Sequence, residues 1–72
     1  MQLCKPMFLD IETNGLNPDT IWVAVTMQDG VVQEHYTPET LTTALAGSFK
    51  VIGHNLLGFD LPVLERIWNV FV

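Results

Sequence analysis

The chain has 72 residues, of which 49% are hydrophobic and 15% charged, and its 8 acidic and 3 basic side chains give a formal net charge of −5. Such a high apolar content excludes a disordered acidic tail, because disordered segments cannot bury enough apolar surface to fold. Three basic residues are too few for a protein that binds nucleic acid through Lys and Arg contacts to phosphates. A chain of this length forms one small domain at most.

The cysteine content and the apolar runs limit where such a chain works. Cys4 is the single cysteine, so no internal disulfide can form. Residues 1–6 have neither the basic start nor the apolar run of a signal peptide. The apolar runs at 21–27 and 56–64 are interrupted by polar residues and are too short to cross a bilayer. We therefore expect a cytoplasmic protein without a membrane partner.

Three strands are expected in the first half of the chain. Residues 7–11 form a short apolar run with the length of a buried strand. Residues 21–28 alternate between two faces, as strand residues do. Asp29-Gly30 then predicts a type I′ turn, since both residue types tolerate positive φ, and residues 31–36 return as the third strand.

The two-residue turn also fixes how the second and third strands pair. In that register Met27 lies opposite Val32, and Val23 lies opposite Tyr36. Both pairs would stand on the same face of the hairpin. The sequence therefore predicts an apolar strip on one side of these two strands.

The second half of the chain alternates helix, strand and helix. Thr37 is expected to cap a short helix that stops at Gly47, and residues 49–52 are expected to form a fourth strand. A second helix is predicted from Leu61, with Pro62 in its first turn, because apolar residues recur there on one helical face: Leu61, Leu64, Trp68 and Phe71. The order β-β-β-α-β-α predicts an α/β fold with a mixed sheet covered by helices.

Two acidic residues interrupt the first predicted strand. Asp10 and Glu12 are two residues apart, so they project from the same side of that strand. Two anions about 4 Å apart repel each other by roughly 4 kcal/mol at an effective dielectric constant near 20, so a positive partner is needed. A divalent cation is the usual partner of oxygen ligands. The alternative is that both side chains stand in water at a strand edge.

A third acid, Asp60, follows the fourth strand and precedes the second helix among apolar residues. One interpretation is a structural N-cap of that helix. The other depends on considering this segment together with the one that contains Asp10 and Glu12.

Two segments taken together carry a family resemblance. Phe-Leu-Asp-Ile-Glu-Thr-Asn-Gly-Leu at 8–16 and His-Asn-x-x-x-Phe-Asp-x-Pro-x-Leu at 54–64 resemble the first two motifs of the DEDD superfamily of 3′→5′ exonucleases. The pair is most similar to the N-terminal proofreading domain of phage DNA polymerases of the T7-like family A type, and the second motif is also similar to family B polymerases. The resemblance implies a ribonuclease H-like fold, of which residues 1–72 are the N-terminal half, as a partial 3′→5′ exonuclease domain.

The resemblance also implies a role for each acid. Asp10 would bridge two Mg²⁺ or Mn²⁺ ions, Glu12 would hold the ion that activates water, and Asp60 would act on the other ion through its water shell. Two such ions suit the in-line hydrolysis of the terminal phosphodiester of single-stranded DNA.

The resemblance further implies that the residues after the first acids receive the DNA 3′ end, namely Thr13, Asn14, Gly15 and Leu16. The alternative for this segment is a tight turn with one buried Leu. Asn55 either lines the DNA strand or caps the fourth strand, and Phe59 either stacks on a base or packs in the core. His54 is expected either to have a structural role or to support the metal-binding residues from behind, rather than to act as a general base.

The third motif of the family is absent from the sequence. No Tyr or His stands three or four residues before an Asp after Asp60, and Glu65 is the one acid downstream. We therefore expect the remainder of a polymerase or exonuclease chain to supply the third motif, and this chain alone to be inactive. The alternatives are a non-catalytic remnant or interaction module that binds a partner through its apolar C-terminal helix, and a related DEDD ribonuclease.

Overall fold

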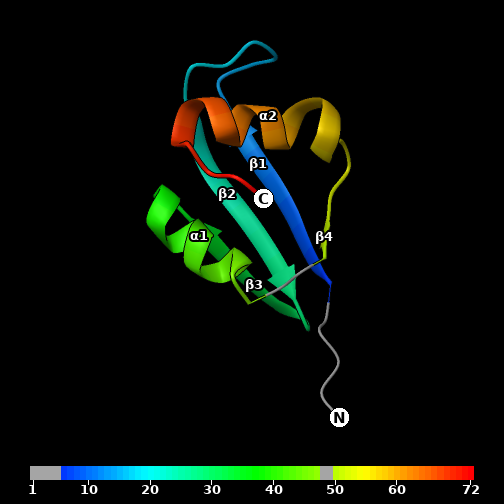
Figure 1. The fold of residues 1–72 in the computed structure, drawn as a ribbon. Helices are drawn as coiled ribbons and strands as arrows, with labels where there is room; N and C mark the ends of the chain where they lie inside the picture. Colours follow the sequence, from blue (N-terminus) through cyan, green and yellow to red (C-terminus); the bar gives the residue numbers. More distant parts are fainter. Residues whose placement is uncertain (1–5, 48–49) are drawn as a thin grey trace.

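The computed structural model describes residues 6–47 and 50–72, and their elements follow the predicted order (Figure 1). These elements are β1 (Met7–Thr13), β2 (Ile21–Gln28), β3 (Val31–His35), α1 (Pro38–Leu45), β4 (Val51–Ile52), η1 (Leu56–Asp60), α2 (Leu61–Val63) and η2 (Leu64–Trp68). The sheet has the strand order β3-β2-β1-β4, in which β1 is antiparallel to β2 and parallel to β4. The protein is a small α/β domain with a mixed four-stranded sheet, as the sequence predicts.

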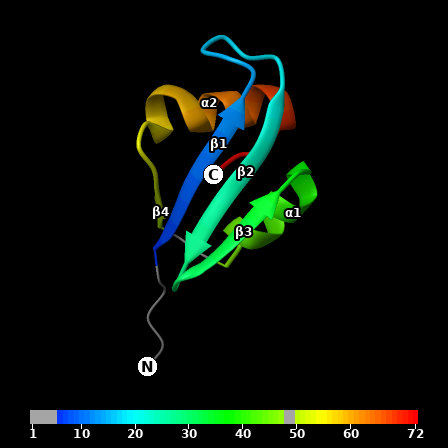
Figure 2. The same ribbon diagram turned by 180° about the vertical axis from the view of Figure 1, so that it is seen from behind.

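Both helical elements cover the same face of the sheet. In Figure 1 they lie in front of the strands, and in Figure 2, from behind, the strands are uncovered. The core fills the space between the helices and the sheet, and its buried apolar residues are Met7, Leu9, Ile11, Ile21, Ala24, Leu41, Leu45, Val63, Leu64 and Val70. The fold is thus a two-layer arrangement with one open sheet face.

The hairpin between β2 and β3 has the predicted turn. Asp29 and Gly30 have φ values of 54° and 78°, as a type I′ turn requires. Met27 pairs with Val32, which confirms the predicted register. The predicted pairing of Tyr36 is wrong, because β3 ends at His35 and the chain turns there toward α1.

Helix α1 begins where its cap predicts. The Thr37 hydroxyl accepts a hydrogen bond from the backbone N–H of Thr40 at 3.4 Å. Leu41 and Leu45 point into the core, and Leu41 is fully buried. The helix ends at Leu45, two residues before Gly47.

The second predicted helix is wrong at both ends. Helical turns begin at Leu56 instead of Leu61, because wide π-helical turns precede α2 and keep Pro62 within a continuous helical segment (residues 56–68). The segment ends at Trp68, since Asn69 adopts a left-handed conformation with φ 57°, so Phe71 lies beyond the helix.

The fourth strand is shorter than predicted. β4 contains only Val51 and Ile52, while Phe49 lies outside the described residues, as does Cys4. Within residues 6–47 and 50–72, no helix has the length and apolar character needed to cross a membrane.

Gly53 allows the chain to leave β4 close to β1. A Cβ atom at this position would lie 2.8 Å from the backbone oxygen of Leu9 and 2.6 Å from Cδ2 of Leu56. No side chain fits there without a shift of its neighbours. This close approach places the following helical segment beside the end of β1.

Candidate functional site

Strand β1 presents different side chains to its two faces. Leu9 and Ile11 are buried beneath the helices, whereas Asp10 and Glu12 are exposed on the open face. A bulge between Glu12 and Thr13 interrupts the pairing of β1 with β2 directly after the second acid. Bulges of this kind are frequent beside active sites, where they redirect a side chain.

Asp60 is the buried acid of the candidate site. Only 6% of its surface is exposed, and its carboxylate accepts a hydrogen bond from the backbone N–H of Ile11. Burial raises the pKa of the Asp60 carboxyl above its ordinary value, and the negative charge of Asp10 raises it further. The fold therefore brings together two acids that are 50 positions apart in the sequence, as the motif pair predicts.

The helix-cap interpretation of Asp60 is wrong. Asp60 precedes α2 with helical backbone angles, and its side chain makes no capping hydrogen bond. The reason is that η1 already continues into α2, so no free helix start remains at this position. The carboxylate is turned toward β1 instead.

His54 and Asp10 both line a shallow groove on the open face. The groove has a volume of about 510 Å³, and apart from these two residues and Gly53 its walls are apolar: Phe8, Leu9, Val25, Met27, Val32 and Ile52. A protonated His54 lowers the pKa of Asp60, against the effect of burial. His54 therefore belongs to the electrostatic surroundings of the two acids, which fits one of the two roles expected for it.

A network of hydrogen bonds shapes the loop between β1 and β2, with Asn14 at its centre. The Asn14 amide nitrogen donates to the Asp19 carboxylate at 2.7 Å, and its amide oxygen accepts from the backbone N–H groups of Asp19 and Thr20 at 3.2 and 3.3 Å. The Thr20 hydroxyl donates to the same carboxylate at 2.9 Å. The hydrogen bonds from Asn14 and Thr20 hold the pKa of Asp19 below its ordinary value.

The same loop exposes Leu16 at its tip. Leu16 is 95% exposed, so the alternative of a tight turn with one buried Leu is wrong. The Thr13 hydroxyl donates to the backbone oxygen of Gly15 at 2.8 Å, which closes the turn without using the Leu16 side chain. The loop that follows the acids of β1 therefore presents an apolar side chain to solvent.

Asn55 and Phe59 belong to the same helical turn as Asp60. The backbone oxygen of Asn55 accepts hydrogen bonds from the N–H groups of Phe59 and Asp60 at 2.9 and 3.2 Å, and its exposed side chain makes no cap bond. Phe59 is half-buried and packs against the core. Asn55 therefore fixes the first turn of the helical segment through its backbone, and Phe59 has at least a packing role.

The acids do not form a closed metal cage. In the described part of the chain, no three His, Cys, Asp or Glu side chains converge into a group that could hold a metal ion. Asp10 and Asp60 interact, and Glu12 shares the open face of β1 with Asp10. The donors are hard oxygen ligands of the kind that Mg²⁺ and Mn²⁺ prefer, but they are incomplete in number.

The comparisons with known proteins leave the family open. No family model, curated protein or solved structure matches the chain. The geometry of the site is therefore what supports a function.

One contact near the site has no signal in the sequence. The guanidinium Nη2 of Arg66 donates to the backbone oxygen of Pro18 at 2.7 Å, across 48 positions of sequence. A backbone acceptor carries no side-chain signature, so only the folded chain shows this pair. Pro18 is buried, although it lies in a loop.

Proposed function

We propose that the chain is the N-terminal part of a metal-dependent 3′→5′ exonuclease of ribonuclease H-like fold. One observation carries this proposal: Asp60 is buried with a raised pKa against a second acid, Asp10. Burying a carboxylate next to another acid costs stability unless a cation or a proton offsets the charge. An acid whose pKa is shifted by burial and by a charged partner is typical of a functional site, and a bound cation would offset the charge of this pair.

The three acids would bind the metal ions in the roles that the sequence motifs suggest. Asp10 and Glu12 would hold the ions from the open face of β1, and Asp60 would support them from its buried position. Bound Mg²⁺ or Mn²⁺ supplies a water of lowered pKa and stabilises the leaving 3′ oxygen. Because the donor set is incomplete, a further carboxylate from the remainder of a polymerase or exonuclease would complete the site.

The loop of residues 13–16 would receive the 3′ end of single-stranded DNA. Leu16 offers an exposed apolar contact for a terminal base, and backbone groups of the loop lie next to it. The low content of Lys and Arg fits a site in which bound ions, rather than basic side chains, meet the phosphate.

A Mn²⁺ titration of the isotopically labelled chain tests the proposal. Bound Mn²⁺ should broaden the NMR signals of the Asp10, Ile11 and Asp60 amides before those of the remaining chain. Asp60→Asn should weaken this effect about tenfold, since affinity for hard cations follows the charge of the ligands. Asp29→Asn is the matched control, because Asp29 lies in the hairpin at the opposite end of β2. Broadening that is unaffected by Asp60→Asn would refute the assignment.

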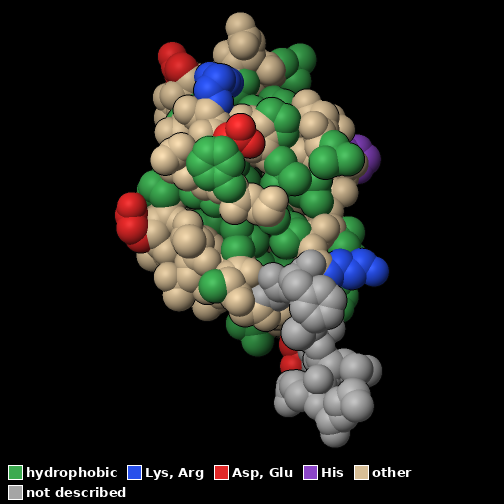
Figure 3. Space-filling view, in the orientation of Figure 1, with side chains coloured by type: hydrophobic (Ala, Val, Ile, Leu, Met, Phe, Trp, Pro, Cys, Tyr) green, Lys and Arg blue, Asp and Glu red, His purple; other side chains and the backbone are tan. Residues whose placement is uncertain are grey.

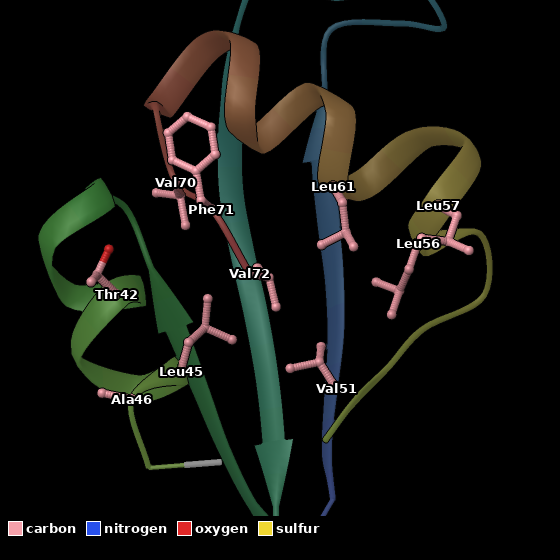
Figure 4. Close-up of a pocket in the computed structure, with 10 residues that line it drawn as sticks. All are labelled: Thr42, Leu45, Ala46, Val51, Leu56, Leu57, Leu61, Val70, Phe71 and Val72. Carbon is pink, nitrogen blue, oxygen red and sulfur yellow. The ribbon is translucent and has the colours of Figure 1, made fainter. Parts of the chain in front are cut away.

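A second candidate function is a non-catalytic interaction module. An apolar hollow of about 740 Å³ lies between α1 and the helical segment, and residues from both helices and the C-terminal end line it (Figure 4). Figure 3 shows hydrophobic side chains gathered over this region. Phe71 and Val72 are exposed at its rim. The Mn²⁺ titration separates the two candidates, because an interaction module does not need the cation.

A further inference from the structure

Arg66 connects the helical segment to the loop that carries Leu16. Its guanidinium donates to the backbone oxygen of Pro18 at 2.7 Å, and its positive charge contributes to the lowered pKa of Asp19. Arg66 lies on η2, which begins with Leu64, and Leu64 is fully buried in the core. The loop is therefore attached to an element that cannot move without disturbing the core.

The same helical segment holds the buried acid of the candidate site. Asp60 is the last residue of η1, and Arg66 follows it within η2. Figure 1 shows the β1–β2 loop rising beyond the end of β1, next to this segment. One rigid element thus fixes both the acid beside β1 and the loop after β1.

Two sets of contacts hold the loop from different sides. The network around Asn14 joins the two ends of the loop, and the backbone N–H of Asn14 also donates to the oxygen of Thr20 at 3.3 Å. Arg66 acts from outside the loop, on Pro18. The inner network holds the shape of the loop, whereas the Arg66 contact, together with the burial of Pro18, attaches the loop to the rest of the fold.

We propose that Arg66 is a positioning residue, which holds the β1–β2 loop so that Leu16 meets the terminal nucleotide beside Asp10 and Glu12. This inference rests on the proposed exonuclease function for its substrate and on the Arg66–Pro18 contact for its geometry. Arg66 itself touches neither the substrate nor the reacting atoms. A fixed loop lowers the entropy cost of ordering the contact when the DNA end binds.

Amide hydrogen exchange tests the attachment without any substrate. Arg66→Met removes the donors and keeps an unbranched side chain of similar length, and we expect the Asp19 and Thr20 amides to exchange about tenfold faster. The amides of Leu9 and Ala24 in the central strands should be unchanged. Glu65→Gln, at the exposed neighbouring position, is the control and should leave the loop amides as they are. Unchanged loop exchange in Arg66→Met would overturn the proposal.

Binding of DNA ends tests what the attachment is for. In Ca²⁺, the unaltered chain should bind a fluorescein-labelled linear (dT)12 with a free 3′ end more tightly than a circular (dT)12, as measured by fluorescence anisotropy. Arg66→Met should lower this preference about fivefold, and Arg66→Lys, which keeps a donating ammonium group and the charge, should restore part of it. A faster-exchanging loop with an unchanged end preference would overturn the positioning role.

The two measurements separate this inference from the function on which it rests. If the unaltered chain does not prefer the linear DNA, the proposed function fails, and the exchange rates still decide whether Arg66 holds the loop. If Arg66→Met unfolds, which loss of protection at Leu9 and Ala24 would show, the comparison is made with Arg66→Lys. NMR shows whether the lysine variant keeps the Pro18 contact. If the contact is lost but amide exchange and end preference equal those of the unaltered chain, the proposal is overturned.

Discussion

The two faces of the sheet differ in what covers them and in what their side chains do. The face beneath α1 and the helical segment contains Leu9 and Ile11, which contribute to the core. The opposite face is uncovered and combines Asp10 and Glu12 with exposed apolar residues such as Val32, which is 61% exposed (Figure 2). Neighbouring residues of one strand therefore differ in role: Leu9 and Ile11 stabilise the core, whereas Asp10 and Glu12 are the acids of the proposed site. Substitutions on the two faces should therefore differ in how much they change the free energy of unfolding.

The largest effect is expected on the covered face, from Leu9→Ala. Leu9 is buried, so its truncation leaves a cavity and should lower the free energy of unfolding by about 2–5 kcal/mol. Urea denaturation followed by circular dichroism measures the change. The neighbouring Phe8→Ala on the open face is the control and should cost much less, because 45% of Phe8 is already exposed. Equal losses in the two variants would contradict the division between faces.

Gly53→Ala should have the next largest effect. The added Cβ would press on the backbone oxygen of Leu9 and on Leu56, so we expect a loss of about 1–3 kcal/mol in unfolding free energy. Gly47→Ala is the matched control, since its Cβ would meet only the Ala44 oxygen at 3.5 Å, an ordinary contact. Thermal unfolding of both variants checks the difference, and a Gly53→Ala protein as stable as the control would show that the chain can leave β4 by another path.

His35 should make the covered face sensitive to acid. Its ring nitrogen Nε2 is 2.8 Å from the Thr26 hydroxyl oxygen, and burial lowers the pKa of His35 below its ordinary value of 6.5. The unfolded chain therefore binds a proton more readily, so this contribution to stability is present above pH 6.5 and is lost as pH falls through the folded-state pKa. His35→Gln should flatten the change in unfolding free energy between pH 7 and pH 5. An unchanged slope would mean that another group carries the acid response.

The smallest change in stability, and one of opposite sign, is expected from Asp60→Asn. The pKa of Asp60 is raised, so its contribution to stability is fully present below pH 3.8 and falls as pH rises through the folded-state pKa. At pH 7 an amide avoids burying the charge and should unfold at a slightly higher temperature than the acid. Below pH 3.8 the two proteins should become equal. Loss of stability at pH 7 would show that the acid serves the fold rather than a charged ligand.

Much of the fold could be predicted because local signals agree with it. Strand alternation gave β2, the Asp29-Gly30 turn gave the register of the hairpin, and Thr37 marked the start of α1. The helix after β4 could not be bounded in the same way. In the sequence, Pro62 indicates the first turn of a helix. In the structure, the helical segment already begins at Leu56 with π-helical turns, which no residue pattern predicts.

Some residues of the candidate site could likewise be predicted from the sequence, and others could not. Asp10 and Glu12 could be selected from residue type and spacing, and Asp60 from the family resemblance of the two segments; the fold places Asp60 close enough to Asp10 for their charges to interact. The exposure of Leu16 and the contact between Arg66 and Pro18 could not be selected, because both depend on how a loop is held by backbone groups far away in sequence.

The short β4 gives Asp60 a second significance. β4 pairs with β1 only at Met7 and Phe8, so the backbone of Ile11 lies beyond the end of this pairing. The Asp60 carboxylate accepts the Ile11 N–H there and takes the place of a missing strand at this edge of the sheet. An asparagine would satisfy the same backbone group without a charge. The sheet needs only an acceptor oxygen at this position. It does not require the negative charge that Asp60 places beside Asp10.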